Sequence, residues 1–479
     1  MNECKSGLFC DFYELTMGQG LLLKNHNPDT VFEMFYRNPP LSSGYAIFTG
    51  IDDVIDNIEN MRFSKEDIDY LSSLKMFHPT FLEYLEAFKF HGDVKAFDDG
   101  EICFPREPLV QVKAPMIEAC IIETMLLNCI NFQTLIATKA SRLKNASGGR
   151  SIMEFGMRRA ATGNASVVAS RAAIIGGADS TSNTLAASMF GLKPSGTMSH
   201  AWVMSFKSEL EAFRTFASLY PTNAILLIDT YDTIGSGIES AIQVGLEQKE
   251  KGYKIGVRID SGDLSYLSKK VREKLNKAGL NDAVICLSND IDETVLRELI
   301  ISGAEVNSFG IGTRLVADGE TLGGVYKMSA SKNEKGEWEN VLKMSSSVEK
   351  LTLPGEHSVY RLFDDAGHPI CDYITLSTEE KPKKGNKITL NHPIYDSETH
   401  TVHSFESAKE MLVPKIINGK RTVPFRKAID IRQASIESLA AFDPSYKRLV
   451  NPHTYKISIS NALKAERNRL VASYKNQED

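Results

Sequence analysis

Between Ser151 and Tyr326 the chain alternates short apolar segments with polar or glycine-rich loops, and a helical stretch follows each loop. The segments at 224–228, 255–259 and 283–287 are nearly continuous apolar runs, a pattern typical of parallel strands buried on both faces. Their ends recur at roughly 20–30 residues, the length of one β/α unit. This rhythm predicts a β/α barrel of seven or eight units, with an open doubly wound sheet as the alternative. The expected strand ends are Glu154, Asp179, His200, Asp229, Asp260, Ser288, Gly310 and Tyr326.

The rhythm is confined to the middle of the chain. Before it, mixed strand and helix patterns, including a long helix over about 116–143, predict an N-terminal α+β domain. After it, NEKGEWE at 333–339 and DDAG at 364–367 predict hairpin turns, and helices are expected over 404–412, 431–441 and 460–474. We therefore divide the chain into an N-terminal domain (1–140), a barrel-like domain (141–345) and a C-terminal extension (346–479). The extension either folds separately or packs on the first domain.

Charge and composition limit the partners. The chain has 55 Lys and Arg against 61 Asp and Glu, a net charge of −6, which argues against general binding to nucleic acid or anionic membranes. The longest apolar stretch, 116–138, is interrupted by Glu118 and Glu123, and the uncharged remainder is shorter than the ~20 residues of a membrane span. The first residues lack a signal-peptide pattern, and the seven cysteines include no CxxC pair. These features predict a soluble cytoplasmic protein.

The expected strand ends carry groups of complementary chemistry. Glycine and hydroxyl loops that lead into a helix suit phosphate, and arginine adds a permanent charge in a fork geometry. Carboxylates suit ribose hydroxyls, or Mg²⁺ that bridges diphosphate oxygens. Taken together they predict a site for a phosphorylated sugar that carries a diphosphate. Singly, each has a structural explanation: Asp179 or Asp229 as a helix N-cap, one of Arg158 and Arg159 in a surface salt bridge, and His200 as a packed histidine.

Several of these segments, taken in order, form a specific set. The chain resembles the nicotinate phosphoribosyltransferases over nearly its whole length. The resemblance rests on DFYELTM at 11–17, FYRNPP at 35–40, EFGMRRA at 154–160, GADSTSN at 177–183, GTMSHAW at 196–202, RIDSGDL at 258–264, FGIGTRL at 309–315 and NPH at 451–453.

This resemblance implies a type II phosphoribosyltransferase fold with a barrel-like α/β domain. It implies transfer of phosphoribose from 5-phosphoribosyl 1-diphosphate to nicotinate, giving nicotinate mononucleotide and diphosphate for NAD salvage. It also implies Mg²⁺ as cofactor and coupling to ATP hydrolysis through phosphorylation of His200, with Arg258 and Asp260 as further catalytic residues. Tyr13 and Arg37 would reach into the site of a neighbouring subunit, so a homodimer is expected.

The resemblance also assigns the remaining site residues. Phe155 and Tyr13 would stack on the pyridine ring, and Arg158 would hold its carboxylate. Asp179 would contact the substrate, as an aspartate contacts the amide in the nicotinamide-using relatives. The ligands of Mg²⁺ stay open. Asp229 and Asp260 are assigned to ribose or Mg²⁺, and Ser288, Asn289, Gly312 and Thr313 to the 5′-phosphate of the product.

Two other functions are compatible with the same fold. A nicotinamide or quinolinate phosphoribosyltransferase would use the same donor with a different pyridine. A non-catalytic metabolite-binding protein would be expected to lose His200, Arg158 or the pair of Arg258 and Asp260, and all four are present.

Overall fold

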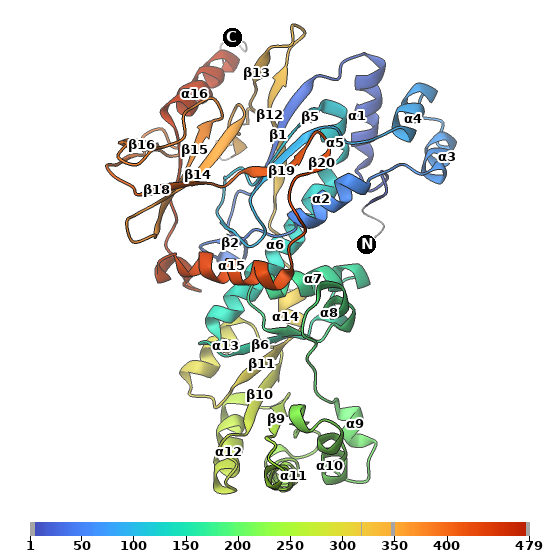
Figure 1. Ribbon diagram of the computed structural model, residues 1–479, viewed down its shortest axis with the longest axis vertical. Helices are drawn as coiled ribbons and strands as arrows, with labels where there is room; N and C mark the ends of the chain where they lie inside the picture. The colour runs from blue at the N-terminus through green and yellow to red at the C-terminus, as the bar shows by residue number, and fades with distance from the viewer. Residues whose placement is uncertain (1–4, 318, 346–349, 476–479) are drawn as a thin grey trace. The chain divides into compact units, whose positions relative to one another are not determined.

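The computed structural model describes residues 5–317, 319–345 and 350–475, and it divides into two compact units (Figure 1). Unit 1 comprises Met1–Leu135, Glu320–Arg426 and Gln433–Asp479, and unit 2 comprises Ile136–Gly319 and Lys427–Arg432. The sequence-based division placed 320–345 in the barrel-like domain. In the structure this segment belongs to unit 1, because its strand β12 (Val325–Lys332) pairs antiparallel with β1 (Asp29–Phe35).

Unit 2 is built on a six-stranded parallel sheet with the order β7-β6-β11-β10-β9-β8. Except for β7 and β8, strands that are consecutive in the chain are adjacent in the sheet, and the last strand, β11, lies beside the first, β6, as in a barrel. Within the described residues β7 and β8 do not pair, so the ring has a seam there. The strands are β6 (Ser151–Glu154), β7 (Ser180–Thr181), β8 (Ile225–Leu227), β9 (Gly256–Ile259), β10 (Val284–Asn289) and β11 (Ser308–Ile311).

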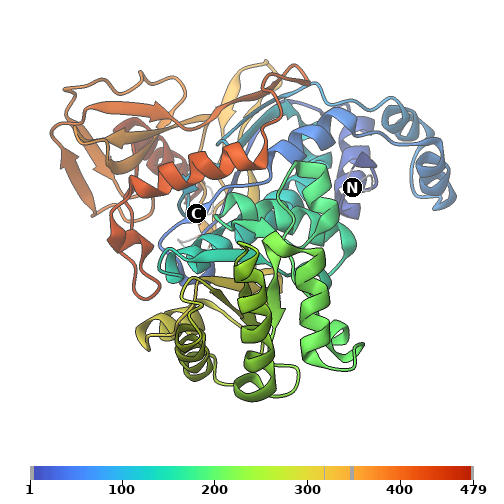
Figure 2. The ribbon, with the colours of Figure 1, turned by 60° about the horizontal axis from the view of Figure 1, so that its bottom comes forward.

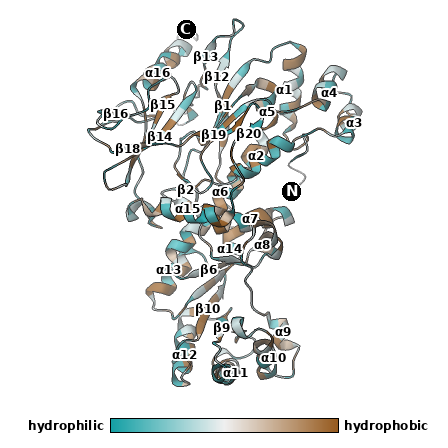
Figure 3. Ribbon diagram, in the orientation of Figure 1, coloured by the Kyte–Doolittle hydropathy of each residue, from teal (hydrophilic) through white to brown (hydrophobic). Residues whose placement is uncertain are grey.

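Helices flank this sheet, and apolar side chains fill the space between them. In Figures 1 and 2 the helices between α7 and α13, green to yellow, lie outside the strands. The strand residues Leu226, Val257 and Leu287 are fully buried, and β10 is brown in the hydropathy view of Figure 3. Both faces of each strand are covered, and this explains why the strand segments are almost entirely apolar. The helices are α7 (Gly163–Ile175), α8 (Thr184–Phe190), α9 (His200–Met204), α10 (Glu209–Leu219), α11 (Ile238–Glu250), α12 (Leu264–Lys277), α13 (Glu293–Ile301) and α14 (Thr313–Val316).

The α/β class with a barrel-like parallel sheet is as predicted, but three expected strand ends are wrong. Asp179 precedes β7 instead of following it. His200 begins helix α9, after an isolated bridge between Thr181 and Pro194. Tyr326 lies inside β12 of unit 1. The described part of the barrel therefore has six paired strands and not seven or eight.

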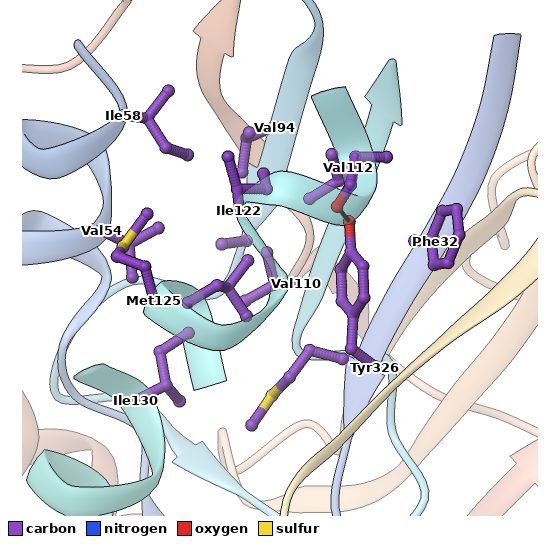
Figure 4. Close-up of a cluster of buried hydrophobic side chains, with 14 of the residues drawn as sticks. Phe32, Val54, Ile58, Val94, Val110, Val112, Ile122, Met125, Ile130 and Tyr326 are labelled. Carbon is purple, nitrogen blue, oxygen red and sulfur yellow. Dashed lines mark hydrogen bonds between the residues drawn. The ribbon is translucent and has the colours of Figure 1, made fainter. Parts of the chain in front are cut away.

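Unit 1 contains a seven-stranded antiparallel sheet with the order β13-β12-β1-β5-β3-β19-β20. Helices α2 (Ile51–Asn60), α5 (Met116–Ile121) and α6 (Glu123–Ala146) contribute apolar side chains to its core (Figure 4). In that core the rings of Phe32 and Tyr326 stack with centroids 4.8 Å apart. The other strands are β3 (Asp93–Ala96), β5 (Val110–Pro115), β13 (Trp338–Asn340), β19 (Val413–Ile417) and β20 (Lys420–Arg421).

A second sheet of unit 1, with the order β17-β16-β21-β15-β14-β18, comes from the C-terminal part of the chain. Both predicted hairpins are confirmed, since β12 pairs with β13 and β14 (His357–Phe363) with β15 (Pro369–Leu376). The helices predicted over 431–441 and 460–474 correspond to α15 (Ala428–Ala440) and α16 (Asn461–Lys475). The helix predicted over 404–412 is wrong, because this segment forms β18 (Ser407–Glu410) on the edge of the sheet. The remaining strands are β16 (Ile388–Asn391), β17 (Thr399–Val402) and β21 (Ile457–Ile459).

The long apolar stretch near residue 120 forms α5 and α6. Met116–Ala146 is long and apolar enough to cross a membrane by length and composition alone, but 61% of its most apolar window is buried inside the protein. Ile117, Ile121 and Met125 belong to the core of unit 1. Burial of this kind is expected of the core helix of a globular domain.

Candidate active site

An open cleft lies at the carboxyl edge of the parallel sheet in unit 2. Loops that follow five of the six strands line it, together with the segment that carries His200. Because the carboxyl ends of parallel strands meet at one edge, residues far apart in the sequence come together here. The lining residues used below are Phe155, Arg158, Arg159, Ser182, Thr197, His200, Arg258, Asp260, Ser288, Asn289, Gly312 and Thr313.

The imidazole of His200 lies between the ends of β8 and β9. Its Nδ1 is 3.1 Å from Thr230 Oγ1, a hydrogen bond, and its Nε2 is 3.9 Å from Asp260 Oδ2. The side chain keeps 40% of its accessible surface, so it is reachable from the cleft. A packed structural histidine would be buried, so the exposure favours a functional position.

Arg258, on β9, holds the loop that leads to His200. Its Nη1 donates to Thr197 Oγ1 (2.6 Å) and to the carbonyl of Met198 (3.2 Å), and its Nη2 lies 3.8 Å from Asp260 Oδ2. The guanidinium is largely buried, and its Nε has no hydrogen-bond partner within the described ranges. One face of this group therefore positions the loop, and Nη2 remains directed toward Asp260.

Asp229 and Asp260 follow neighbouring strands and are linked by hydrogen bonds. The backbone N–H of Asp260 and the hydroxyl of Ser261 donate to Asp229 Oδ2, at 2.9 and 2.6 Å. Ser288 donates its hydroxyl to Asp260 Oδ1 at 2.5 Å. Ser288, which the sequence assigned to phosphate, thus orients a carboxylate in this structure.

Glycine residues let the loop after β11 approach Phe155 closely. A Cβ on Gly310 would lie 2.5 Å from the ring of Phe155, and one on Gly312 would lie 2.9 Å from its carbonyl oxygen. Asn289 adopts φ 123°, outside the regions that most residues occupy. Gly312 and Thr313 line the same cleft as Asn289, and their assignment to a phosphate loop stays a prediction.

Arg158 and Arg159 both line the cleft, in the short helical turn η3 (Met157–Arg159). Both are exposed, and neither makes an ion pair with another part of the described chain. The interpretation that one of them forms a surface salt bridge is therefore wrong. Two free guanidinium groups beside the Phe155 ring suit a planar anion.

Asp179 does not join these residues. It accepts hydrogen bonds from Lys144 Nζ (2.8 Å), Arg432 Nη2 (2.7 Å) and the backbone N–H of Ile152 (2.9 Å), all within unit 2. Burial opposes its ionisation, but these donors outweigh burial and hold its pKa below the usual value. Asp179 precedes β7, away from the carboxyl edge, and its two oxygens are engaged. The structure thus places Asp179 outside the cleft lining, with both carboxylate oxygens bound to groups of its own unit.

The sequence reading gave no role to Thr197 and Thr230, and it used Glu154 only as a strand-end landmark. Glu154 is buried and accepts hydrogen bonds from Ser170 (2.9 Å), Thr181 (2.5 Å) and the backbone of Gly156, so it fixes the loop after β6. Thr230 directly follows Asp229 at a strand end, and that position could have drawn attention to it.

Tyr13 and Arg37 belong to unit 1, whereas the cleft is formed by unit 2. Tyr13 is 46% exposed on α1 (Phe12–Leu23), and burial of its ring together with the charges of Glu123 and Glu14 raises its pKa. Burial also raises the pKa of Glu14 to about 8. Arg37 lies 5.7 Å from the ring centroid of Phe35, and its Nε is buried with no hydrogen-bond partner in the part of the chain that is described.

The candidate metal ligands are few. Among the described residues no group of three or more His, Cys, Asp or Glu side chains is arranged to hold a metal ion. Asp229 Oδ1 is buried and has no hydrogen-bond partner among those residues, so one carboxylate oxygen is free to accept a cation. Mg²⁺ in phosphate-binding sites is commonly held by one or two carboxylates together with substrate oxygens. Asp229 and Asp260 fit that requirement.

Comparison with known proteins accounts for most of the chain. It matches three family models: the nicotinate phosphoribosyltransferase N-terminal domain over residues 8–131, the nicotinate phosphoribosyltransferase family over 150–349, and the corresponding C-terminal domain over 356–466. The chain is 36% identical over 457 residues to the nicotinate phosphoribosyltransferase of Bacillus subtilis (strain 168), covering 95% of this chain and 92% of the relative. It is 30% identical to that of Homo sapiens, covering 97% and 96%.

Solved structures show the same relationship. The crystal structure of human nicotinic acid phosphoribosyltransferase superposes with a TM-score of 0.84 at 28% identity, covering 96% of this chain and 99% of the human chain. A nicotinate-nucleotide pyrophosphorylase from Pyrococcus furiosus gives a TM-score of 0.73 at 23% identity, covering 92% of this chain and 97% of the other, which shows a shared fold.

Proposed function

The chain belongs to the nicotinate phosphoribosyltransferase family, and from this premise we propose that it joins nicotinate to 5-phosphoribosyl 1-diphosphate. The products are nicotinate mononucleotide and diphosphate. The reaction is coupled to ATP hydrolysis through a phosphohistidine at His200. The observation that carries the proposal is the match of all three family models to one chain whose cleft combines arginines, carboxylates and glycine loops.

The pyridine substrate is held by Phe155 and Arg158. The ring stacks on Phe155, and its carboxylate accepts hydrogen bonds from Arg158, with Arg159 adding charge. The pyridine nitrogen is already a free nucleophile, so no general base is required. Nicotinate is favoured over nicotinamide because Asp179, the aspartate expected to receive the amide, is ion-paired elsewhere.

The bond that breaks joins C1 of the ribose to diphosphate, and positive charge develops on the sugar. A preorganised carboxylate next to that carbon stabilises the charge, and Asp260 is held for this role by Ser288. Asp229 and Asp260 would hold Mg²⁺, and a bound Mg²⁺ would supply positive charge for the leaving diphosphate. Asn289, Gly312 and Thr313 contribute polar groups to the 5′-phosphate.

Tyr13 and Arg37 act in the site of a second subunit in a homodimer. Arg37 supports this role because its Nε lacks a hydrogen-bond partner among the described residues of its own chain. Tyr13 supports it because a large aromatic ring stays 46% exposed.

The decisive experiment is a mononucleotide-formation assay with 5-phosphoribosyl 1-diphosphate and Mg²⁺. Nicotinate, nicotinamide and quinolinate are offered in turn, each with and without ATP. Turnover of nicotinate alone, increased by ATP, is the expected result. A preference for nicotinamide would overturn the substrate assignment, and no turnover with any of the three by folded protein would favour a non-catalytic binding protein.

A further inference from the structure

The two ring nitrogens of His200 have different surroundings. Nδ1 is 3.1 Å from Thr230 Oγ1, which is hydrogen-bond distance. Nε2 is 3.9 Å from Asp260 Oδ2, which is too long for a hydrogen bond, so Nε2 has no hydrogen-bond partner among the described residues. Thr230 comes from the end of β8 and Asp260 from the end of β9, so two strands fix the neighbours of the ring.

A threonine hydroxyl can donate or accept, and both cases lead to the same nitrogen. If Thr230 accepts, the proton is on Nδ1 and the lone pair of Nε2 is free. If Thr230 donates, the lone pair of Nδ1 is occupied, and Nε2–H points toward the carboxylate of Asp260, an acceptor for its proton. In either case Nδ1 is engaged by Thr230, and Nε2 is the nitrogen without a hydrogen-bond partner among the described residues, on a side chain that lines the cleft.

We propose that Thr230 is a positioning residue that directs phosphoryl transfer from a nucleoside triphosphate to Nε2 of His200. This inference rests on the phosphohistidine of the proposed function. The lone pair of Nε2 attacks the γ-phosphorus and the Nε2–P bond forms. The bond from that phosphorus to the β,γ-bridging oxygen breaks, and its electron pair leaves with the nucleoside diphosphate. The proton stays on Nδ1, and the Nδ1–H group donates a hydrogen bond to Thr230 Oγ1. Water later attacks the phosphorus and a P–O bond forms, the Nε2–P bond breaks with its electron pair returning to Nε2, and inorganic phosphate leaves.

The groups around Nε2 are themselves held in place. Ser288 binds the other oxygen of Asp260, and Asp229 accepts from the backbone of Asp260. Arg258 Nη2 lies 3.8 Å from the same Oδ2 that flanks Nε2, so an incoming phosphoryl group meets a guanidinium as well as a carboxylate. Nδ1 has only the Thr230 hydroxyl beside it, and no cation contacts it among the described residues.

The test identifies which nitrogen carries the phosphoryl group. The full chain is incubated with γ-labelled ATP and Mg²⁺, and the Nδ1 and Nε2 phosphohistidine isomers are separated after alkaline hydrolysis. Wild type and Thr230→Ser, which keeps the hydroxyl, should carry label on Nε2 alone. Thr230→Val, which keeps the shape without the hydroxyl, should show some label on Nδ1 and roughly threefold to tenfold slower phosphorylation, the effect expected for one lost hydrogen bond. The isomer ratio would not move if Thr230 only supported the fold.

Three outcomes would overturn the inference, and they are distinguishable. Label on Nδ1 in wild type refutes it and leaves the phosphohistidine intact. Wild type that carries no more label than His200→Ala refutes the phosphohistidine itself. Thr230→Val that matches wild type in both isomer and rate refutes the role of Thr230. The wild-type isomer is informative even where Thr230→Val does not fold.

Discussion

Replacing Asp179 with asparagine should destabilise unit 2 and leave nicotinate binding intact. The asparagine would keep the shape of the side chain but lose the charge shared by Lys144 and Arg432. Both cations would then face a neutral amide. Because Asp179 lies outside the lining of the cleft, the Michaelis constant for nicotinate should stay within about twofold of wild type.

The size of the effect follows from the contacts. Hydrogen bonds between charged groups contribute about 1.5–3 kcal/mol each when buried, and exposed pairs contribute about 0–1 kcal/mol. The Asp179 side chain keeps 29% of its accessible surface, between these limits. We therefore expect a loss of about 1–2 kcal/mol in the free energy of unfolding. For a domain of about 200 residues this lowers the melting temperature by roughly 2–8 °C.

The sign of the pH dependence is also determined. The pKa of Asp179 is lowered in the folded protein, so its stabilising effect is fully present above the unfolded value of about 4. It is lost as the pH falls through the folded pKa. The difference in melting temperature between wild type and Asp179→Asn should therefore be constant from about pH 6 to 8 and shrink below about pH 4.

The assay is thermal unfolding paired with steady-state kinetics on the same preparations. Asp282→Asn is the matched control, because Asp282 pairs with Lys254 at 3.1 Å but both side chains are more than half exposed, and it should unfold like wild type. Arg432→Gln combined with Asp179→Asn should cost less than the sum of the two single changes. A large increase in the Michaelis constant for nicotinate with an unchanged melting temperature would refute the structural role and restore Asp179 as a substrate ligand.

Three further predictions concern the cleft and the proposed dimer. His200→Ala should abolish the stimulation of turnover by ATP and leave a slow ATP-independent rate; stimulation that persists would exclude a phosphohistidine at this position. Arg158→Ala removes a charge-assisted hydrogen bond and should raise the Michaelis constant for nicotinate by roughly tenfold to a hundredfold, with a much smaller change for the ribosyl donor. Equal changes for both substrates would reject its assignment to the pyridine. Mixing an Arg37→Ala chain with an Arg258→Ala chain should restore part of the activity, because one of the two composite sites is then intact. Verified mixed dimers without recovery would contradict a shared site.

The barrel-like sheet was predictable because its central strands are buried on both faces. β8, β9 and β10 are mostly apolar, and a strand that is buried on both faces needs no alternation of polar and apolar residues. The same reasoning did not identify β7. It is only two residues long, its residues are Ser180 and Thr181, and the apolar residues before it belong to α7. The error at Asp179 follows directly, because a strand end was placed where the strand in fact begins.

In the C-terminal part, the prediction of secondary structure from the sequence failed for a different reason. Phe405, Ala408 and Leu412 have helical spacing, and the sequence therefore predicted a helix. The segment instead forms the edge strand β18, whose hydrogen bonds go to β14. Hydrogen bonding to a strand that is distant in the sequence outweighs a weak local preference for helix. A local sequence pattern does not indicate that such a strand is available for pairing.

In the cleft, residue type and strand position predict which side chains come together, but they do not predict the hydrogen-bond partners of those side chains. Strand ends in a parallel sheet converge, so the positions of Arg258 and Asp260 followed once the strands were placed, whereas His200 reaches the cleft from the start of α9 and not from a strand end. The partners of each polar atom depend on which loops face each other after folding. Arg258 binds the loop at Thr197, and Ser288 binds Asp260, although sequence reasoning directed both residues toward substrate. A polar group in such a site satisfies its hydrogen bonds within the protein first, and only the donors left over, such as Arg158 and Arg159, remain free for an anion. For this reason these two arginines and the partly exposed ring of His200 are the positions where substitution should separate substrate binding from stability.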